Sequence, residues 1–260
     1  MGITFTNGFT ISSPTPAAPA SPYDLLVKLD SSDAGSYPGT GTTWYDLQGS
    51  NNGTLNSGSG EINYAGEYEG VFDLSGGTGT KITIANGPDV QLSASTTKAY
   101  SIWFKADAVG FMSFSRTLMC KLRGLGGSST TDGFWMGINN SNQLVAKVAS
   151  DNGTRTSYIS GIGATISTNT WYMGTLLVKV SSDSDTFKLF INDIEVGTTN
   201  GGGSFLSSDS NNLLLGNYDT GVQGAQPFDG MLGEFYVHSG TFGIDEITSL
   251  FNDTKARFGY

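Results

Sequence analysis

Two glutamates, Glu67 and Glu69, are the nearest approach in this sequence to a catalytic pair of carboxylates. Glycosidases that retain configuration need two carboxyl groups about 5–5.5 Å apart. Side chains two residues apart share a face of a β-strand, so these two acids would lie together if the segment is a strand. The next position on that face is Val71, while Tyr68 and Phe72 point the other way. We therefore interpret the pair as solvent-facing acids of a strand and expect no glycosidase activity.

Aspartates beside turns are the candidate ligands for a metal ion, and they are Asp132, Asp183, Asp185 and Asp219. Calcium binds roughly six to eight oxygen ligands, often at the rim of a loop. The segment Asp183-Ser184-Asp185 is the densest acidic pair, but it lacks the glycine and the final glutamate of an EF-hand loop. Aspartate is also a favoured turn residue. Calcium ligation and ordinary turn chemistry both remain open, and we expect no other cofactor.

Three aromatic residues next to turns, Trp44, Tyr45 and Tyr218, are candidates for stacking on sugar rings. Core packing is the alternative for Trp44. The single histidine, His238, follows a strand-like run and is interpreted as structural. The single cysteine, Cys120, excludes an internal disulfide and is assigned to the core.

The first eleven residues carry no charge and place apolar side chains at alternate positions on either side of Asn7-Gly8: Ile3, Phe5, Phe9 and Ile11. Asn-Gly between two alternating runs is a strong hairpin signal, and one extended strand is the alternative. An isolated hairpin is only marginally stable in water. We therefore expect these side chains to dock on a partner chain or, alternatively, on their own domain.

Residues 12–22 hold four of the seven prolines of the chain. Such a segment cannot pair within a sheet, and extended it spans about 34 Å. We predict a docking arm over residues 1–11, a Pro/Ala/Ser tether over residues 12–22 and one β-sandwich over residues 23–260. The reach of the tether favours a neighbouring chain as the partner of the arm, and hence a homo-oligomer.

Composition and charge limit the class of protein. Glycine accounts for 37 of 260 residues, about twice the usual ~7%, and charged residues for 14% against a usual ~25%. These values are typical of strands and tight turns. The net charge of −10 would repel the phosphates of nucleic acids and of anionic membranes, so neither is an expected partner. No apolar run approaches the ~20 residues of a membrane span, and residues 1–5 show no secretion signal.

Short apolar alternations separated by turn clusters follow each other from residue 23 to residue 237. This pattern predicts an all-β fold, a two-sheet antiparallel β-sandwich or jelly roll. The more continuous apolar run over residues 172–178 predicts a central strand that is buried on both faces. Helical spacing of Ile244, Ile247 and Phe251 predicts one short C-terminal helix over about residues 244–252.

Several segments follow one another in a recognisable order. They are Leu25-Leu26-Val27-Lys28-Leu29-Asp30, Gly70-Val71-Phe72-Asp73-Leu74, Tyr100-Ser101-Ile102-Trp103-Phe104-Lys105, Phe187-Lys188-Leu189-Phe190-Ile191-Asn192 and Phe228-Asp229-Gly230-Met231-Leu232-Gly233-Glu234-Phe235. In this order they resemble the laminin-G-like branch of the concanavalin A-like lectin/glucanase superfamily. The resemblance covers about residues 24–260. It implies a concanavalin A-like jelly roll, and it raises carbohydrate binding and glucanase activity as functions.

Three further segments carry a narrower resemblance. They are Tyr37-Pro38-Gly39-Thr40-Gly41-Thr42-Thr43-Trp44-Tyr45-Asp46-Leu47, the tail Phe251-Asn252-Asp253-Thr254-Lys255-Ala256-Arg257-Phe258-Gly259 and the opening segment before the prolines. They resemble domains in virion proteins of tailed bacteriophages, including those of cyanophages. This resemblance implies a non-catalytic structural protein of a virion assembled in the host cytoplasm: a capsid decoration, head-fibre, neck or tail-fibre component. The arm would bind other virion proteins. A carbohydrate-binding module for host surface polysaccharide is the alternative, and a glycoside hydrolase is the remote one.

Overall fold

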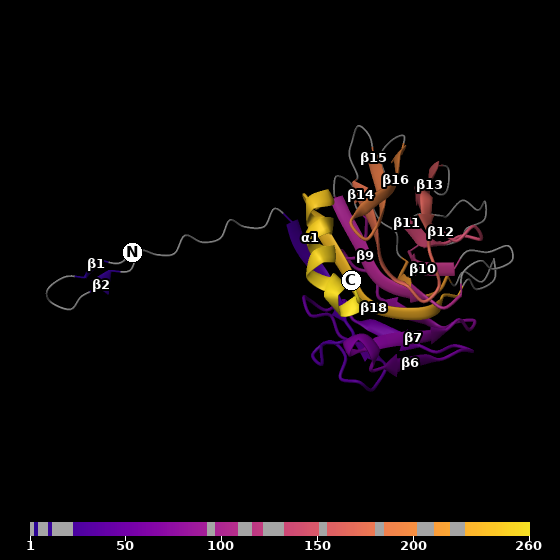
Figure 1. Cartoon of the computed structure of the whole chain (residues 1–260), viewed down its shortest axis with the longest axis horizontal. Coiled ribbons are helices and arrows are strands. Elements are labelled where there is room, and N and C mark those ends of the chain that lie inside the picture. The colour runs from indigo at the N-terminus through magenta and orange to yellow at the C-terminus, as the bar shows by residue number, and fades with distance from the viewer. Residues whose placement is uncertain are drawn as a thin grey trace.

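The computed structural model describes residues 3–4, 10–11, 23–92, 97–108, 116–121, 133–150, 155–179, 185–201, 211–218 and 227–260. Within these residues two large antiparallel sheets face each other across a shared core (Figure 1). One short helix lies near the C-terminus. The predicted fold class, an antiparallel β-sandwich with one short C-terminal helix, is confirmed.

The first sheet has eight strands. In spatial order they are β13 (Arg155–Thr165), β12 (Gln143–Ser150), β11 (Gly133–Ile138), β10 (Arg116–Cys120), β17 (Leu213–Leu215), β8 (Lys81–Ile84), β5 (Gly53–Asn56) and β4 (Thr43–Trp44). Strands far apart in the chain meet here, since β17 lies between β10 and β8. Such pairings require the whole domain to be folded.

The second sheet also has eight strands. They are β16 (Ile194–Gly201), β15 (Asp185–Ile191), β14 (Trp171–Lys179), β9 (Thr97–Ala106), β18 (Asp229–Gly240), β7 (Val71–Ser75), β6 (Ile62–Ala65) and β3 (Tyr23–Asp30). The long strand β18 pairs with β9 on one side. On its other side the first part of β18 pairs with β7 and the later part with β3.

The core lies between the two sheets and takes alternate residues from each strand. In β14, Leu176 and Val178 point into this core, while Met173 and Leu177 belong to a second cluster on the outer face. The prediction that residues 172–178 form a strand buried on both faces is therefore confirmed for most of its length. Cys120 is 1% exposed, as its assignment to a buried position requires.

The helix α1 (Ile244–Thr254) and the 3-10 helix η2 (Lys255–Phe258) cover part of the outer face of the second sheet (Figure 1). Glu246 accepts a hydrogen bond from the backbone N–H of Gly243 at 2.8 Å, which caps the start of α1. The rings of Trp103 and Phe258 stack with their centroids 4.3 Å apart. The predicted helix is confirmed and extends two residues beyond its expected end.

At the N-terminus, β1 (Ile3–Thr4) and β2 (Thr10–Ile11) pair antiparallel in a two-stranded sheet of their own. This is the hairpin alternative of the two that the sequence left open. Residues 5–9 and the tether over residues 12–22 lie outside the described residues, as do the side chains of Ile3 and Ile11.

Candidate binding groove on the second sheet

Two of the three aromatic residues predicted to stack on sugars are buried. Trp44 and Tyr218 are both 0% exposed, so neither offers a ring face to a ligand. The sugar-stacking assignment is corrected for both, and the core-packing alternative for Trp44 is confirmed. Trp44 packs edge-on against Phe72 in the core, with the ring centroids 4.9 Å apart. Tyr45 is 46% exposed and remains available for stacking. Tyr64, which the sequence analysis did not select, is also exposed, but within the described residues no ring contact joins it to Tyr45.

Most of the other predicted site residues lie outside the described part of the chain. This applies to Phe5 and Phe9 of the arm and to the candidate calcium ligands Asp132, Asp183 and Asp219. Asp185 begins β15, and its side chain is not described. Among the described residues, no group of three or more His, Cys, Asp or Glu side chains is arranged to hold a metal ion.

The acids Glu67 and Glu69 lie in a 3-10 helix, η1 (Glu67–Glu69), and not in a strand. Tyr68 and Glu69 adopt positive φ angles of 52° and 65°, which break the extended conformation. Tyr68 packs edge-on against Trp171, so the apolar side chain anchors this turn. The strand prediction is wrong here, and the two acids do not form the same-face pair that it implied.

A buried pair of carboxylates, Asp30 and Glu234, is present but already bound. Arg257 donates to Asp30 at 2.9 Å and to Glu234 at 2.6 Å, and all three side chains are almost closed to solvent. Burial, and next the charge of Asp30, raise the pKa of Glu234, while hydrogen bonds from Tyr236 and Arg257 oppose that rise. Because the arginine occupies both carboxylates, they hold the C-terminal segment to the sheet and have no access to a substrate.

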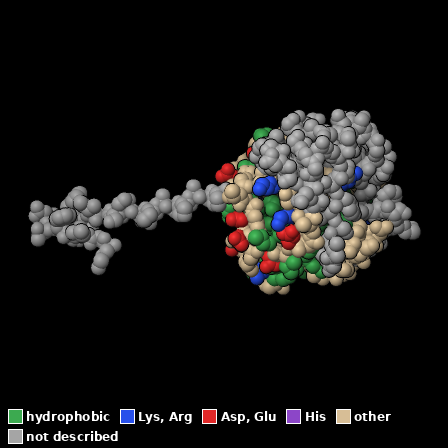
Figure 2. Space-filling view, turned by 90° about the horizontal axis from the view of Figure 1, so that it is seen from above, with side chains coloured by type: hydrophobic (Ala, Val, Ile, Leu, Met, Phe, Trp, Pro, Cys, Tyr) green, Lys and Arg blue, Asp and Glu red, His purple; other side chains and the backbone are tan. Residues whose placement is uncertain are grey.

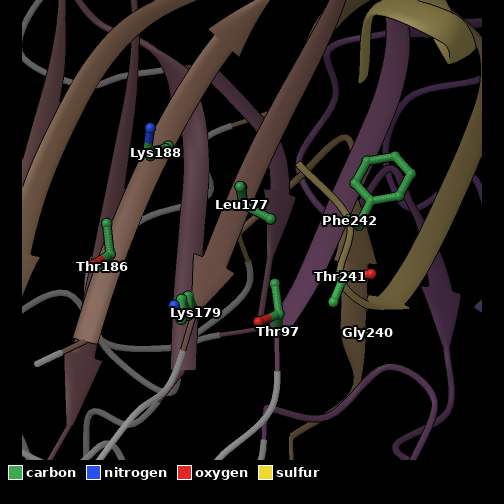
Figure 3. Close-up of a pocket in the computed structure, with 8 residues that line it drawn as sticks. All are labelled: Thr97, Leu177, Lys179, Thr186, Lys188, Gly240, Thr241 and Phe242. Carbon is green, nitrogen blue, oxygen red and sulfur yellow. The ribbon is translucent and has the colours of Figure 1, made fainter. Parts of the chain in front are cut away.

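One accessible hollow in the described surface is a groove on the outer face of the second sheet, beside the start of α1 (Figure 3). Its volume of about 470 Å³ lies within the range of about 300–1,000 Å³ that is usual for ligand sites. We call it the β14 groove. Its lining residues are Thr97, Leu177, Lys179, Thr186, Lys188, Gly240, Thr241 and Phe242.

Strand register brings these residues together. Lys179 of β14 pairs with Thr186 of β15 on one side and with Thr97 of β9 on the other, so the three form one row across the sheet. Leu177 and Lys188 pair two residues further along, on the same face. Neighbouring strands lie about 4.8 Å apart. The row therefore places one ammonium group between two hydroxyl groups.

One wall of the groove is apolar and uncharged. Phe242 stacks on the ring of His238 with the centroids 4.2 Å apart, and it meets Tyr23 edge-on at 5.3 Å. Burial lowers the pKa of His238 to about 4, so the imidazole is neutral at pH 7. Its Nδ1 atom has no hydrogen-bond partner among the described residues. Phe242 is only 4% exposed and so forms a wall of the groove without presenting a stacking platform.

The two lysines of the groove differ in their surroundings. Lys188 forms an ion pair with Glu195 of β16, at 2.8 Å between Nζ and Oε2. Lys179 is exposed and makes no ion pair with the described acids. None of the eight lining residues is acidic, although the surface seen in Figure 2 carries Asp and Glu side chains beside its lysines and arginines.

The lining offers binding chemistry without catalytic chemistry. Threonine hydroxyls donate and accept hydrogen bonds, lysine donates only, and Leu177 provides an apolar floor. Among the lining residues that the structure describes there is no carboxylate, histidine or thiol. The sequence analysis missed these residues because Lys179 and Thr97 are 82 positions apart and only the strand register makes them neighbours.

The β-sandwich matches a known protein family. Residues 75–248 match the laminin G-type family described as the Concanavalin A-like lectin/glucanases superfamily. The chain belongs to this superfamily. No curated protein matches its sequence. Among the described residues, no helix of this superfamily member is long and apolar enough to cross a membrane.

Solved structures with the same fold include domain 4 of AbnA, a GH43 extracellular arabinanase from Geobacillus stearothermophilus, in complex with arabinotriose. It is 18% identical to the chain, with a TM-score of 0.60, and the match covers 88% of the chain and 98% of that domain. The binding domain of botulinum neurotoxin serotype G is 15% identical, with a TM-score of 0.62 and coverage of 90% and 52%. The binding domain of Paraclostridial Mosquitocidal Protein 1 is 14% identical, with a TM-score of 0.61 and coverage of 88% and 52%. The chain spans about half the length of these toxin domains.

Proposed function

We propose that this superfamily member is a non-catalytic saccharide-binding domain whose ligand lies in the β14 groove. The observation that carries the proposal is the lining of that groove: three threonines and two lysines around an apolar floor, with no catalytic group among them. Domain 4 of AbnA, which the chain matches over nearly the whole of that domain, was solved with a bound arabinotriose. That comparison supports a saccharide as the class of ligand.

Saccharides have the two properties that this lining complements. A sugar ring carries hydroxyl groups, which act as both donors and acceptors, and a C–H face, which is apolar. Threonine hydroxyls bind the first, and Leu177 with the wall of Phe242 contacts the second. A polysaccharide on the surface of a host cell is the natural source of such a ligand for an adhesion domain.

Binding to an array of neutral and acidic oligosaccharides, followed by titration calorimetry of the best binder, tests this proposal. We expect saturable binding that is lost when Thr186→Trp fills the groove. Thr54→Trp is the matched control, because Thr54 is exposed on β5 of the other sheet. An array without any binder would refute the proposal, and so would equal binding by the two variants. Release of reducing sugar from the bound oligosaccharide would contradict a non-catalytic role.

We also propose display of this domain from a bacteriophage virion, through residues 1–22, as a capsid decoration, head-fibre, neck or tail-fibre component. The sequence resemblance to virion proteins supports this role. The pairing of β1 with β2 apart from both large sheets supports it as well. A two-stranded hairpin is marginally stable alone, so a neighbouring virion protein or a second copy of the chain would complete it.

Deletion of residues 1–22 tests the role of the arm. The truncated chain is expected to keep the thermal unfolding of the full chain, because the two sheets of the sandwich begin at Tyr23. It is also expected to lose self-association, as measured by light scattering after gel filtration. Unchanged oligomer mass after truncation would remove the arm from assembly.

A further inference from the structure

The charged residues described in the lining of the β14 groove are opposite in sign to the net charge of the chain. The chain carries a net charge of −10, yet the eight lining residues include two lysines and no acid. A neutral sugar needs no cation, since hydroxyl and amide groups satisfy its hydrogen bonds equally well. The lysines therefore point to a ligand that carries negative charge.

Lys179 is the better placed of the two lysines to bind an anion. Lys188 is already held by Glu195 at 2.8 Å, whereas Lys179 is exposed and free of any ion pair with the described acids. The register sets Thr186 and Thr97 on either side of Lys179. An anionic group between them would receive a charge-assisted hydrogen bond from the ammonium group and hydrogen bonds from two hydroxyls. Figure 3 shows these three side chains along one edge of the groove.

The rest of the lining argues against a simple inorganic anion. Leu177 and Phe242 add an apolar surface next to the row of polar groups, and a free phosphate or sulfate has no apolar face to cover it. A sugar ring that bears an acidic group meets both requirements. Its C–H face covers Leu177 while its acidic group reaches Lys179.

We propose that the ligand of the β14 groove is an acidic saccharide, whose carboxylate or sulfate binds between Lys179, Thr97 and Thr186. This inference rests on the proposed function and names its substrate class. It also assigns Glu195 a role, because its ion pair holds Lys188 away from the ligand and limits the affinity for anions.

The test compares acidic sugars with a neutral derivative of one of them. On the array, the strongest binders are expected to be acidic. Trigalacturonic acid, its neutral methyl ester and a sulfated galactan disaccharide are then titrated, which separates a carboxylate from a sulfate. For the acidic binder, Lys179→Gln is expected to weaken binding about tenfold, which corresponds to about 1.4 kcal/mol, because it removes a charge-assisted hydrogen bond. Raising the salt concentration is expected to weaken it further.

Two further variants sharpen the comparison. Glu195→Gln releases Lys188 and is expected to strengthen binding of the acidic sugar about threefold, because it removes a competing negative charge. Lys255→Gln makes the same change in net charge as Lys179→Gln on η2, away from the lining of the groove, and is expected to change nothing.

The outcomes separate this inference from the proposed function. If the neutral sugars bind as tightly as the acidic ones, or Lys179→Gln weakens both equally, the groove binds saccharides without reading their charge and the inference is wrong. If no sugar on the array binds, the proposed function fails as well.

Discussion

At the residue scale, Arg257 makes several hydrogen bonds and ion pairs from one nearly buried guanidinium group. Besides Asp30 and Glu234, its guanidinium donates to the carbonyl of Tyr68 at 2.7 Å and to the hydroxyl of Ser31 at 3.2 Å. Removing buried charges from water costs free energy, and the loss of one partner leaves the other charge buried without compensation. The arginine therefore joins the C-terminal segment to β3, η1 and β18 at one point.

Removal of this arginine gives the first prediction. Arg257→Met is expected to lower the free energy of unfolding by about 3–5 kcal/mol, because it leaves two buried carboxylates facing each other without a cation. Urea unfolding followed by circular dichroism measures the loss. Lys255→Met, two residues earlier on η2, is the control, with an expected change of about 0.5 kcal/mol or less. Similar values for the two variants would show that the buried network does not stabilise the fold.

His238 gives the second prediction, which concerns pH. Burial lowers its pKa from 6.5 to about 4 in the folded chain, so the unfolded chain binds a proton first as the pH falls. The stability that the neutral imidazole contributes is complete above pH 6.5 and is lost between pH 6.5 and pH 4, by roughly 2–3 kcal/mol. His238→Phe is expected to lack this loss while keeping the stack on Phe242. Urea unfolding at pH 7.5, 5.5 and 4.0 compares the two proteins, and parallel pH profiles would contradict the assignment.

At the element scale, α1 and η2 hold an aromatic layer against the second sheet. Phe251 and Phe258 both stack on Trp103 of β9, and Phe258 also packs on Trp171 of β14 at 4.6 Å. The helical segment covers the Trp171 end of β14 and leaves the Lys179 end open. The groove is lined instead by Gly240, Thr241 and Phe242, the residues that lead from β18 toward α1.

The third prediction tests this layer. Phe258→Ala is expected to lower the free energy of unfolding by about 3–5 kcal/mol, since it opens a cavity against two tryptophans. Ile244→Ala is the control on the same helical segment, because Ile244 is 46% exposed and its loss opens no cavity. Thermal and urea unfolding measure both variants. A small effect of Phe258→Ala would mean that η2 is held by Arg257 alone.

At the scale of the whole molecule, the core between the two sheets is large, and a domain of this size can fold without a disulfide or a structural metal ion. A chain of this length buries roughly 70–75% of the surface that the unfolded chain exposes. Within the described residues, no group of side chains is arranged to hold a metal ion. The apolar core and the ladders of the two sheets stabilise the described sandwich.

The fourth prediction follows from that packing. Addition of EDTA is expected to leave the melting temperature nearly unchanged, because a structural metal would stabilise the folded chain by its binding free energy. Differential scanning calorimetry with and without the chelator makes the comparison, and re-addition of calcium is the control. A fall of more than about 5 °C that calcium reverses would show that one of the aspartates at the loops is a ligand.

The sequence by itself determined the class of fold, the strand over residues 172–178 and the C-terminal helix, because these features depend on local periodicity. Apolar residues at every second position predict a strand, and apolar residues at helical spacing predict a helix. Both patterns can be recognised from residues that are close together in the sequence. The wrong prediction of a strand at Glu67 and Glu69 also came from local periodicity. Alternation was present there, but the docking of Tyr68 on Trp171, more than 100 positions away, decided the local conformation.

Only the tertiary structure decided which residues share a site. Trp44 is an aromatic residue beside a turn, as a sugar-stacking residue often is, yet packing against Phe72 buries it. Lys179, Thr97 and Thr186 have no local pattern in common, and their row exists because β14 pairs with β9 and β15 in one register. The local pattern of each strand does not show which distant strand will pair with it. The elements are therefore a local property of this chain, and the groove is a property of their assembly.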